Sequence, residues 1–433
     1  MVDAKRRVPD WLNSPLWYSP DSNHHHHANA TVYVDIDEEE DPPIATSIHQ
    51  PPPPPIAVRE GRDASDEGAS TSSVPSAEEV ARNAQLFVEL SKKIVNMREV
   101  RRLVSMGVPD GTSVRPTLWK LLLGYLPTDR ASWPAELAKK RSQYRHLKEE
   151  LLISPSEVLK RLEKLNFPNN EPKCESRGPL PRSEVTHAEH PLSLWKSSIW
   201  FKFFQDTDIL EQIERDVLRT HPDLPFFATD SPFSKSNREA LRRILIIFTK
   251  LNPGIRYVQG MNEILAPLFY VFRNDADEEN LGHVEADTFF CFVELFSRFR
   301  DNFCQQLDDS AVGVRSAITK LSQLLREHDE ELWRHLEFTC KVNPQFYAFR
   351  WITLLLTREF DFSDCLHIWD ALLSDSEGLQ ETLFRICCAM LIFIRRRLLA
   401  GDFTSNLKLL QNYPATNISH LLYVANKLRT HPS

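Results

Sequence analysis

The chain has 433 residues, of which 42% are hydrophobic and only 12 are glycine, and its formal net charge is −8. A chain of this length can bury one large core or two or three smaller ones. Residues 1–85 hold 15 acidic and six basic residues, so the remainder is close to neutral at +1. A body without a basic excess argues against a general nucleic-acid-binding protein. The chain has few glycines, and its apolar residues do not alternate with polar residues as they do in strands. Both features predict an all-α fold.

Residues 1–75 differ in composition from the rest of the chain. They contain four histidines at 24–27, the acidic run "DIDEEED" at 35–41 and five prolines at 51–55. Because this segment offers too little apolar surface to offset the entropy of ordering, a disordered acidic and proline-rich tail is predicted. The prolines favour either a plain spacer or a polyproline II segment that binds an aromatic groove of a partner. The histidine run alone is weak evidence for a metal site.

Helices are predicted in chain order after the tail. Residues 76–104 are predicted to form an N-terminal helix that begins at a capping box, with Ser76 as the cap and Glu79 three residues later. Its apolar positions at helical spacing are Leu86, Phe87, Leu90, Ile94 and Val95. The stretch "GVPDGTSVRPTLWKLLLGYLP" at 107–127 predicts the next helix, in which Pro116 fits the first turn.

Three further stretches are interpreted from composition. Residues 166–192, rich in Pro, Asn and Ser, are predicted to form a flexible loop, and residues 401–433 to add C-terminal helices packed on the domain. The apolar run at 386–394 is too short to span a bilayer and is predicted to be a buried helix, so we expect a soluble, cytoplasmic protein. The seven cysteines show no CxxC spacing and are interpreted as free buried thiols.

A helix predicted over residues 206–223 carries the first polar pair. Its apolar stripe is Ile209, Leu210, Ile213, Val217 and Leu218, and its candidate caps are Asp206 and Thr207. Asp216 and Arg219 are three residues apart and therefore share one face, where the carboxylate can orient the guanidinium. Taken alone, the pair is more simply explained as a surface ion pair worth about 0–1 kcal/mol.

A second polar site follows at "YVQG", residues 257–260, between two apolar helices. The residues "NPG" at 252–254 break the first of these helices. Gly260 permits the close approach of another group to the backbone. Gln259 carries both a donor and an acceptor, so it can hold a partner's backbone or orient a water molecule. On these residues alone, a buried glutamine that bridges two helix ends is the alternative.

The segments "IERDVLR" at 213–219 and "YVQG" at 257–260 match the patterns Ile-x-x-Asp-x-x-Arg and Tyr-x-Gln-Gly. In their order and separation the chain resembles the TBC-domain Rab GTPase-activating proteins. The likeness includes "RPTLWKLLLGYLP", "WFKFFQDTD", "RTHPDLPFF" and "FYAFRWITLLLTREF", and it covers roughly residues 105–400. It implies an all-helical TBC domain over 105–400 that accelerates GTP hydrolysis by small Rab GTPases and so regulates vesicle trafficking.

The resemblance also implies roles for single residues. Arg219 would be an arginine finger and Gln259 a glutamine finger, both supplied in trans, while Asp216 would position Arg219 and Tyr257 and Gly260 would shape the loop that presents Gln259. Eight other family-like residues are predicted to pack the core rather than to catalyse. They are Arg115, Trp119, Arg350, Trp351, Arg358, Glu359, Trp369 and Asp370.

No glycine in the chain is followed by lysine, so the phosphate-binding loop GxxxxGK[ST] is absent. We therefore expect no cofactor or metal of the chain's own, since GTP and Mg²⁺ are carried by the partner GTPase. The expected partner is a GTP-bound Rab, with membranes reached only through it and a further partner for the proline-rich segment left open. The chain would thus be an enzyme activator; the alternative is a non-catalytic, Rab-binding helical adaptor. The presence of both candidate fingers favours the activator.

Overall fold

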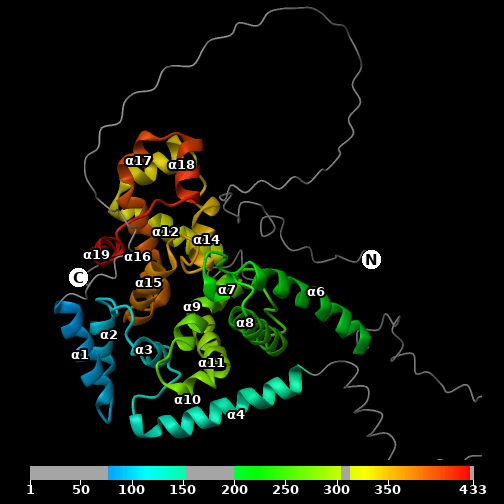
Figure 1. Cartoon of the computed structure of the whole chain (residues 1–433). Helices are drawn as coiled ribbons and strands as arrows, with labels where there is room; N and C mark the ends of the chain where they lie inside the picture. Colours follow the sequence, from blue (N-terminus) through cyan, green and yellow to red (C-terminus); the bar gives the residue numbers. More distant parts are fainter. Residues whose placement is uncertain (1–76, 153–198, 304–312, 430–433) are drawn as a thin grey trace, which may run out of the picture. The chain divides into compact units, whose positions relative to one another are not determined.

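The computed structural model describes three stretches of the chain, residues 77–152, 199–303 and 313–429. All of these residues belong to one compact unit. They form helices joined by loops (Figure 1), and the only extended pairing among them is an isolated bridge between Ile94 and Asp129. The all-α prediction is therefore confirmed. Three predictions concern residues outside the described ranges: the tail, the cap Ser76 of the N-terminal helix, and the loop at 166–192.

Two helices occupy the N-terminal segment for which one was predicted: α1 (Ala77–Ser91) and α2 (Met97–Val104). The break has a local cause, because the Asn96 side chain accepts hydrogen bonds from the backbone N–H groups of Arg98 and Glu99 and so begins α2. The buried Glu89 carboxylate also accepts from the Asn96 backbone N–H at 2.8 Å. The predicted apolar stripe is wrong at two positions, since Phe87 is 47% exposed and Ile94, which lies in the break, is 66% exposed.

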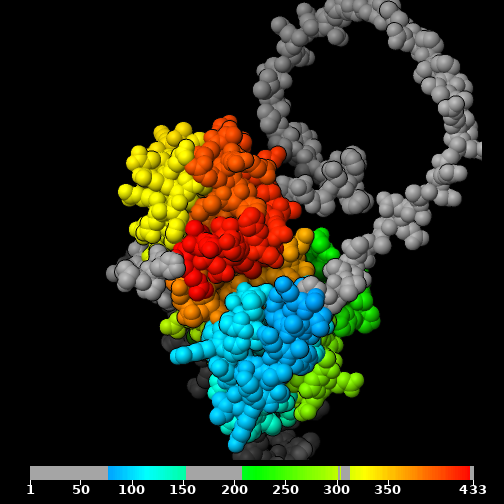
Figure 2. Space-filling model, turned by 90° about the vertical axis from the view of Figure 1, so that its left-hand side faces the viewer, coloured from blue at the N-terminus to red at the C-terminus, as the bar shows by residue number. Residues whose placement is uncertain are grey.

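The next helix, α3 (Arg115–Leu122), begins with Pro116 in its first turn, as predicted, and packs on α15 (Phe362–Ser374). Trp119 is fully buried and stacks on Trp369 with 5.7 Å between ring centroids. Its indole N–H donates to Asp370 at 2.7 Å. Helix α2 also contacts α15, so the N-terminal helices, blue to cyan in Figure 2, are fixed to C-terminal elements far along the chain.

The centre of the unit is built from α8 (Pro232–Leu251), α9 (Met261–Arg273) and α11 (Val284–Ser297), which pack on one another. Phe248 meets Phe292 and Phe296 at centroid distances of 5.0 and 5.2 Å. Helix α4 (Trp133–Leu151) packs on α8 and α11, and α6 (Ile199–Leu218) packs on α8 and α9. The short helices α7 (Pro225–Ala228) and α10 (Glu278–Leu281) join this group.

Helix α6 corrects two expectations. It begins at Ile199, so Asp206 and Thr207 lie inside the helix and do not cap it. The helix ends at Leu218, which is 57% exposed although it was assigned to the apolar stripe, whereas Ile213 and Val217 are buried as predicted. The helix end therefore falls directly before Arg219.

The C-terminal part surrounds α16 (Leu379–Phe393), a largely buried helix that contacts α12, α14, α15 and α19. It includes most of the apolar run predicted to form a buried helix. The other helices here are α12 (Val314–His328), α13 (Glu330–Arg334), α14 (Ala348–Thr353), α17 (Arg395–Ala400), α18 (Phe403–Gln411) and α19 (Ile418–Lys427). Helix α19 packs on α16. In the described ranges no helix is both long and apolar enough to cross a membrane.

Most of the residues assigned to core packing do tie helices together. Arg115 lies 3.1 Å from the fully buried Asp370, and Arg350 donates two hydrogen bonds to Glu359 at 2.5 and 2.7 Å. Arg350 also donates to the carbonyl of Gln411 at 2.7 Å, which links α14 to the end of α18. Five described cysteines are free, and four of them are buried.

Candidate functional site

The first part of the site is the end of α6. Arg219 is the first residue after the helix, and its backbone N–H still donates to the carbonyl of Asp216 at 3.3 Å. Its side chain returns to the same residue, with Nη2 donating to Asp216 Oδ1 at 2.5 Å. The Asp216 side chain is 2% exposed and that of Arg219 is 38% exposed. The predicted pair therefore exists, with its carboxylate buried and its guanidinium reaching the surface.

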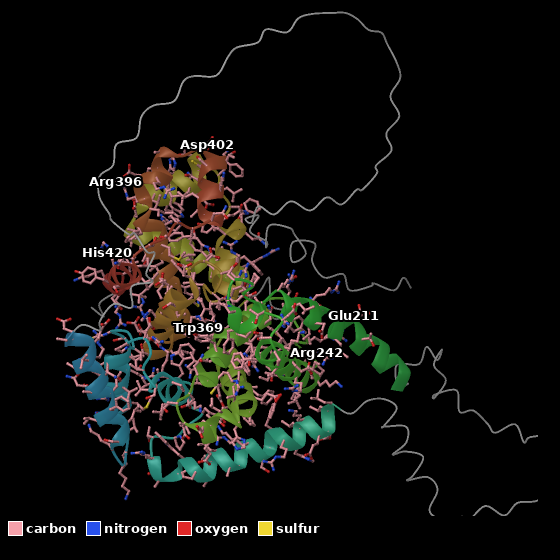
Figure 3. The ribbon with its side chains drawn as sticks, viewed as in Figure 1. Glu211, Arg242, Trp369, Arg396, Asp402 and His420 are labelled. Atoms are coloured by element: carbon pink, nitrogen blue, oxygen red, sulfur yellow. The ribbon has the colours of Figure 1, made fainter. Side chains whose placement is uncertain are left out.

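Helix α6 is held against α8 beside this site. Arg242 of α8 places its Nε atom 2.7 Å from the Glu214 carboxylate of α6. Figure 3 labels Arg242 together with Glu211 of α6 in the region where the two helices lie next to each other. The end of α6 is therefore fixed by packing on both α8 and α9, which limits how far Arg219 can move with its helix.

The second part is the loop from Asn252 to Gly260, which joins α8 to α9. Tyr257 is buried there and donates its hydroxyl hydrogen to Asp216 Oδ2 at 2.7 Å. Gly260 precedes α9 with φ +101°, and a Cβ atom at this position would lie 2.5 Å from Cδ2 of Leu354. The prediction that Gly260 allows a close approach is confirmed. Gln259, between them, is half-buried.

Two polar residues that the sequence reasoning missed connect these parts. Asn262, 2% exposed, donates from Nδ2 to Thr220 Oγ1 at 2.9 Å and to the carbonyl of Asp216 at 3.2 Å. Glu263 is buried with one carboxylate oxygen 3.4 Å from His221 Nε2. A signal was present, because adjacent Asn and Glu in the first turn of the otherwise apolar α9 are unusual for a buried helix face.

Arg358 requires a correction, because it was grouped with the core residues. Its side chain is 30% exposed, and its Nη1 atom lies 3.7 Å from the Glu263 carboxylate. It follows a segment in which Leu355 and Leu356 have φ values of 50° and 64°, a conformation that costs energy for residues other than glycine. Leu354, just before them, is the residue that contacts Gly260. This segment therefore forms part of the site.

Burial controls the charges in the cluster. It raises the pKa of Asp216 to about 6, and the hydrogen bond from Tyr257 opposes that rise. Burial raises the pKa of Glu263 to about 7, opposed by the nearby Arg358 guanidinium. Burial lowers the pKa of His221 to about 3, so this imidazole is neutral at physiological pH. Asp216 is thus ionised above pH 6 and can pair with the Arg219 guanidinium.

The site contains the Arg219 guanidinium at the end of α6 and the Gln259 amide in the loop before α9, and hydrogen bonds from Arg219 and from Tyr257 join both segments to Asp216. A guanidinium donates to phosphate or carboxylate oxygens, and an amide can orient a water molecule. Within the described ranges no group of three or more His, Cys, Asp or Glu side chains could hold a metal ion. A guanidinium and an amide can supply hydrogen bonds, and the guanidinium can also stabilise negative charge.

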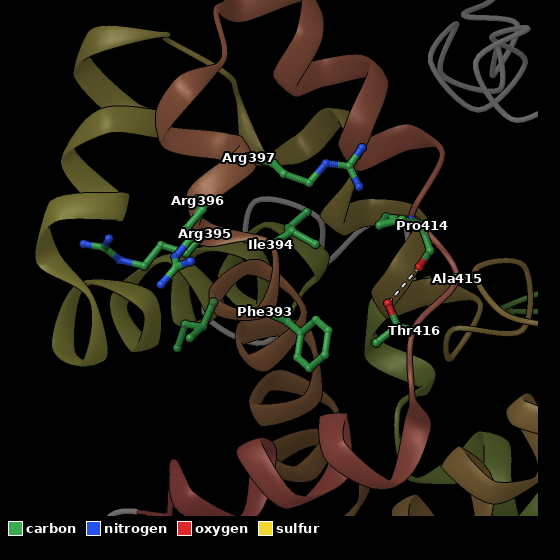
Figure 4. A pocket seen from close by; sticks show the side chains of 9 residues that line it. Phe393, Ile394, Arg395, Arg396, Arg397, Pro414, Ala415 and Thr416 are labelled. Atoms are coloured by element: carbon green, nitrogen blue, oxygen red, sulfur yellow. Dashed lines mark hydrogen bonds between the residues drawn. The ribbon is translucent and has the colours of Figure 1, made fainter.

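Two surface cavities lie apart from this cluster. One, of about 420 Å³, is lined by Ile392–Arg397 and Pro414–Thr416. Figure 4 shows its arginines pointing in different directions, with the Thr416 hydroxyl donating to the carbonyl of Pro414. Arg395 is already paired with Asp329 and Glu331. The other, of about 570 Å³, lies between the 110–116 segment, α9 and α15. Neither includes Arg219 or Gln259.

The fold and the site together define an all-α domain with an arginine at a helix end, beside a Tyr-x-Gln-Gly loop. Residues 200–399 match the family model of the Rab-GTPase-TBC domain. TBC1 domain family member 13 of Homo sapiens is 36% identical over 400 residues, which cover 78% of this chain and 96% of that protein. The chain belongs to the TBC Rab-GAP family.

Two further relatives are more distant. A TBC domain-containing protein of Schizosaccharomyces pombe is 28% identical, covering 79% of this chain and 72% of that protein. The crystal structure of the Ypt/Rab-GAP domain of Gyp1p is similar with a TM-score of 0.62 at 26% identity. That similarity covers 81% of this chain and 98% of the Gyp1p domain, so almost the whole solved domain has a counterpart here.

Proposed function

We propose that this protein accelerates GTP hydrolysis by a small Rab GTPase and supplies Arg219 and Gln259 to the partner's active site. Membership of the TBC Rab-GAP family supports the activity. The assignment of residues is carried by one observation: the buried Asp216 carboxylate accepts hydrogen bonds from both the half-exposed Arg219 and the Tyr257 hydroxyl. A surface ion pair would not need a buried carboxylate with a second donor from another segment.

Arg219 acts on the charge that develops during phosphoryl transfer. Negative charge spreads over the transferred and leaving oxygens, and a guanidinium aimed at them stabilises the transition state. Such arginines contribute about 10³ to 10⁵ in rate, or roughly 4–7 kcal/mol. Asp216 accepts from one N–H of the guanidinium. The planar fork of an arginine carries five N–H donors in all, a geometry that suits phosphate oxygens. The GTP and Mg²⁺ are held by the Rab.

Gln259 orients the attacking water from the half-buried loop before α9. Its amide can accept a hydrogen from the water and donate to a neighbouring oxygen, which a carboxylate or an ammonium cannot do. Tyr257 anchors the loop on Asp216, and Gly260 lets it lie directly on Leu354. The two candidate fingers are therefore attached to the same buried carboxylate, Arg219 directly and Gln259 through its loop. Action on a membrane-attached Rab would place the protein in the cytoplasm, at the membranes whose vesicle traffic it regulates.

The test is phosphate release from a panel of GTP-loaded Rab proteins, first with the unmodified protein. On the Rab that responds, Arg219→Ala, Arg219→Lys and Gln259→Ala should each lower the stimulated rate by about 10² or more, with the fold intact by circular dichroism. Arg215→Ala is the matched control, because Arg215 is an exposed arginine of the same helix and donates from Nε to the carbonyl of Glu211, one turn earlier. It should retain full activity.

The adaptor alternative gives a different result. An adaptor would bind a GTP-loaded Rab without accelerating hydrolysis, and its binding would not depend on Gln259. A Rab whose own catalytic glutamine is replaced by leucine distinguishes the roles further, because Gln259 should still support its stimulation. Binding with no acceleration on any Rab of the panel would overturn the proposed activity.

A further inference from the structure

Two segments carry the proposed fingers, and their relative position must be fixed by something other than the fingers. Arg219 follows the end of α6, and Gln259 lies two residues before α9. The Tyr257 hydroxyl joins the two segments through the Asp216 side chain. The side-chain amide of Asn262, in the first turn of α9, makes a second connection. It donates to the backbone carbonyl of Asp216, in the last turn of α6, and to the hydroxyl of Thr220 just after it.

The contacts of Asn262 converge on the turn that carries Arg219. Its Nδ2 atom lies 3.2 Å from the carbonyl oxygen of Asp216 and 2.9 Å from Thr220 Oγ1. The Thr220 hydroxyl donates to the same Asp216 carbonyl at 2.9 Å, and the Arg219 backbone N–H lies 3.3 Å from it. The Asp216 carbonyl therefore accepts hydrogen bonds from Arg219, Thr220 and Asn262. The amide fixes the turn on both sides of Arg219.

An amide at this position is costly unless its hydrogen bonds are used. Asn262 is 2% exposed, and its neighbours Met261 and Ile264 are fully buried apolar residues. Burial of an amide without partners costs about 1–3 kcal/mol by mutational measures, so an apolar residue would fill the site more simply. Both hydrogens of the amide face acceptors, two of them on the end of α6. The hydrogen bonds of the Asn262 amide therefore join the start of α9 to the end of α6.

We propose that Asn262 is a positioning residue that sets the Arg219 guanidinium relative to Gln259. The proposal rests on the proposed function, since it concerns the same reaction. Asn262 does not touch the partner; it holds the last turn of α6 at a fixed place on the start of α9. When the amide is removed, the turn can shift while α6 stays packed on α8. A displacement of about 1 Å can lower a rate by about 10² without much effect on binding.

The experiment measures kcat and KM for hydrolysis by the responsive Rab with Asn262→Ala. We expect kcat to fall by about 10-fold or more while KM changes by less than about 3-fold, because docking uses other surfaces. Asn237→Ala is the matched control: Asn237 is a 1% exposed asparagine of α8 whose amide donates to the carbonyl of Phe226. A general loss of packing would lower the activity of both variants, whereas the proposed role lowers only that of Asn262→Ala.

A double-mutant cycle separates positioning from mere structure. In the Arg219→Ala background there is no guanidinium to misplace, so Asn262→Ala should cost less than about 3-fold under single-turnover conditions. An equal cost in both backgrounds, an unchanged kcat, or an equal loss in the Asn237 control would overturn the proposal. If the unmodified protein stimulates no Rab, the proposed function fails, and this inference with it.

A milder variant covers the case in which Asn262→Ala does not fold. Thr220→Val keeps the shape of a 1% exposed side chain and removes only the hydroxyl that accepts from Asn262 and donates to Asp216. We expect it to lower kcat by roughly 3- to 10-fold, again with little change of KM and with the effect lost in the Arg219→Ala background. Unchanged kcat in Thr220→Val would contradict the proposal.

Discussion

Asp216→Asn should make the protein more stable and less active. The buried Asp216 carboxylate orients the Arg219 guanidinium, but its ionised form lowers the free energy of unfolding. Burial raises the folded-state pKa of Asp216 from 3.8 to about 6. The folded state therefore holds this proton more tightly than the unfolded state, so the free energy of unfolding falls as pH rises from about 4 to about 6, and the loss is complete above that range. At about 1.36 kcal/mol per pKa unit, the ionised carboxylate costs about 3 kcal/mol at about pH 8.

The asparagine keeps the shape of the side chain and one acceptor for the Tyr257 hydroxyl, but it loses the ionic contact with Arg219. That contact contributes only about 1 kcal/mol, because the Arg219 side chain is 38% exposed and screened by solvent. The expected net gain is about 2 kcal/mol at about pH 8, and it shrinks as pH falls toward about 5, where Asp216 takes up its proton. The stimulated rate should fall by about 10-fold or more, because the guanidinium loses its orientation.

Urea unfolding at about pH 8 and about pH 5 measures the first effect, and Rab-stimulated phosphate release measures the second. The same variant tests both the stability and the stimulated rate. If the carboxylate only stabilised the fold, Asp216→Asn would be less stable and its stimulated rate would not change. A lower stability of Asp216→Asn at the higher pH, or an unchanged stimulated rate, would refute the reasoning.

Three further substitutions test other parts of the site and fold. Gly260→Ala should lower stability by about 1–3 kcal/mol, seen as a lower Tm, because φ is +101° and the new Cβ meets Leu354; an unchanged Tm would contradict this. Burial raises the pKa of Glu263 to about 7, so its ionised form costs stability above that pH; Glu263→Gln should raise Tm more at about pH 8 than at about pH 5, and an equal shift at both would count against it. Glu359→Ala leaves buried Arg350 without its carboxylate and should cost about 3–5 kcal/mol in urea unfolding, whereas a loss under about 1 kcal/mol would show that the pair is dispensable.

Features that depend on near neighbours in the chain could be predicted from the residues alone. The spacing of Asp216 and Arg219 predicted their contact, because residues three apart on a helix lie side by side. The break before α9 and the place of Gly260 followed from the conformational limits of proline and glycine. The motifs were enough to indicate the family and the all-α fold. Local signals also misled: Asp206 and Thr207 are typical caps, yet α6 runs through them from Ile199, since packing outweighs propensity.

The distant residues that complete the site could be identified only from the packing of the folded chain. Tyr257 and Asp216 are 41 residues apart, and their hydrogen bond depends on how α6 lies against α9. The apolar period of each helix shows which face is buried, but it does not specify which residue of another helix that face meets. For the same reason Asn262 could not be connected to the turn of Arg219, nor Arg358 to Glu263. Those contacts arise from the packing of whole helices, which brings a buried carboxylate, an amide and a guanidinium to one place.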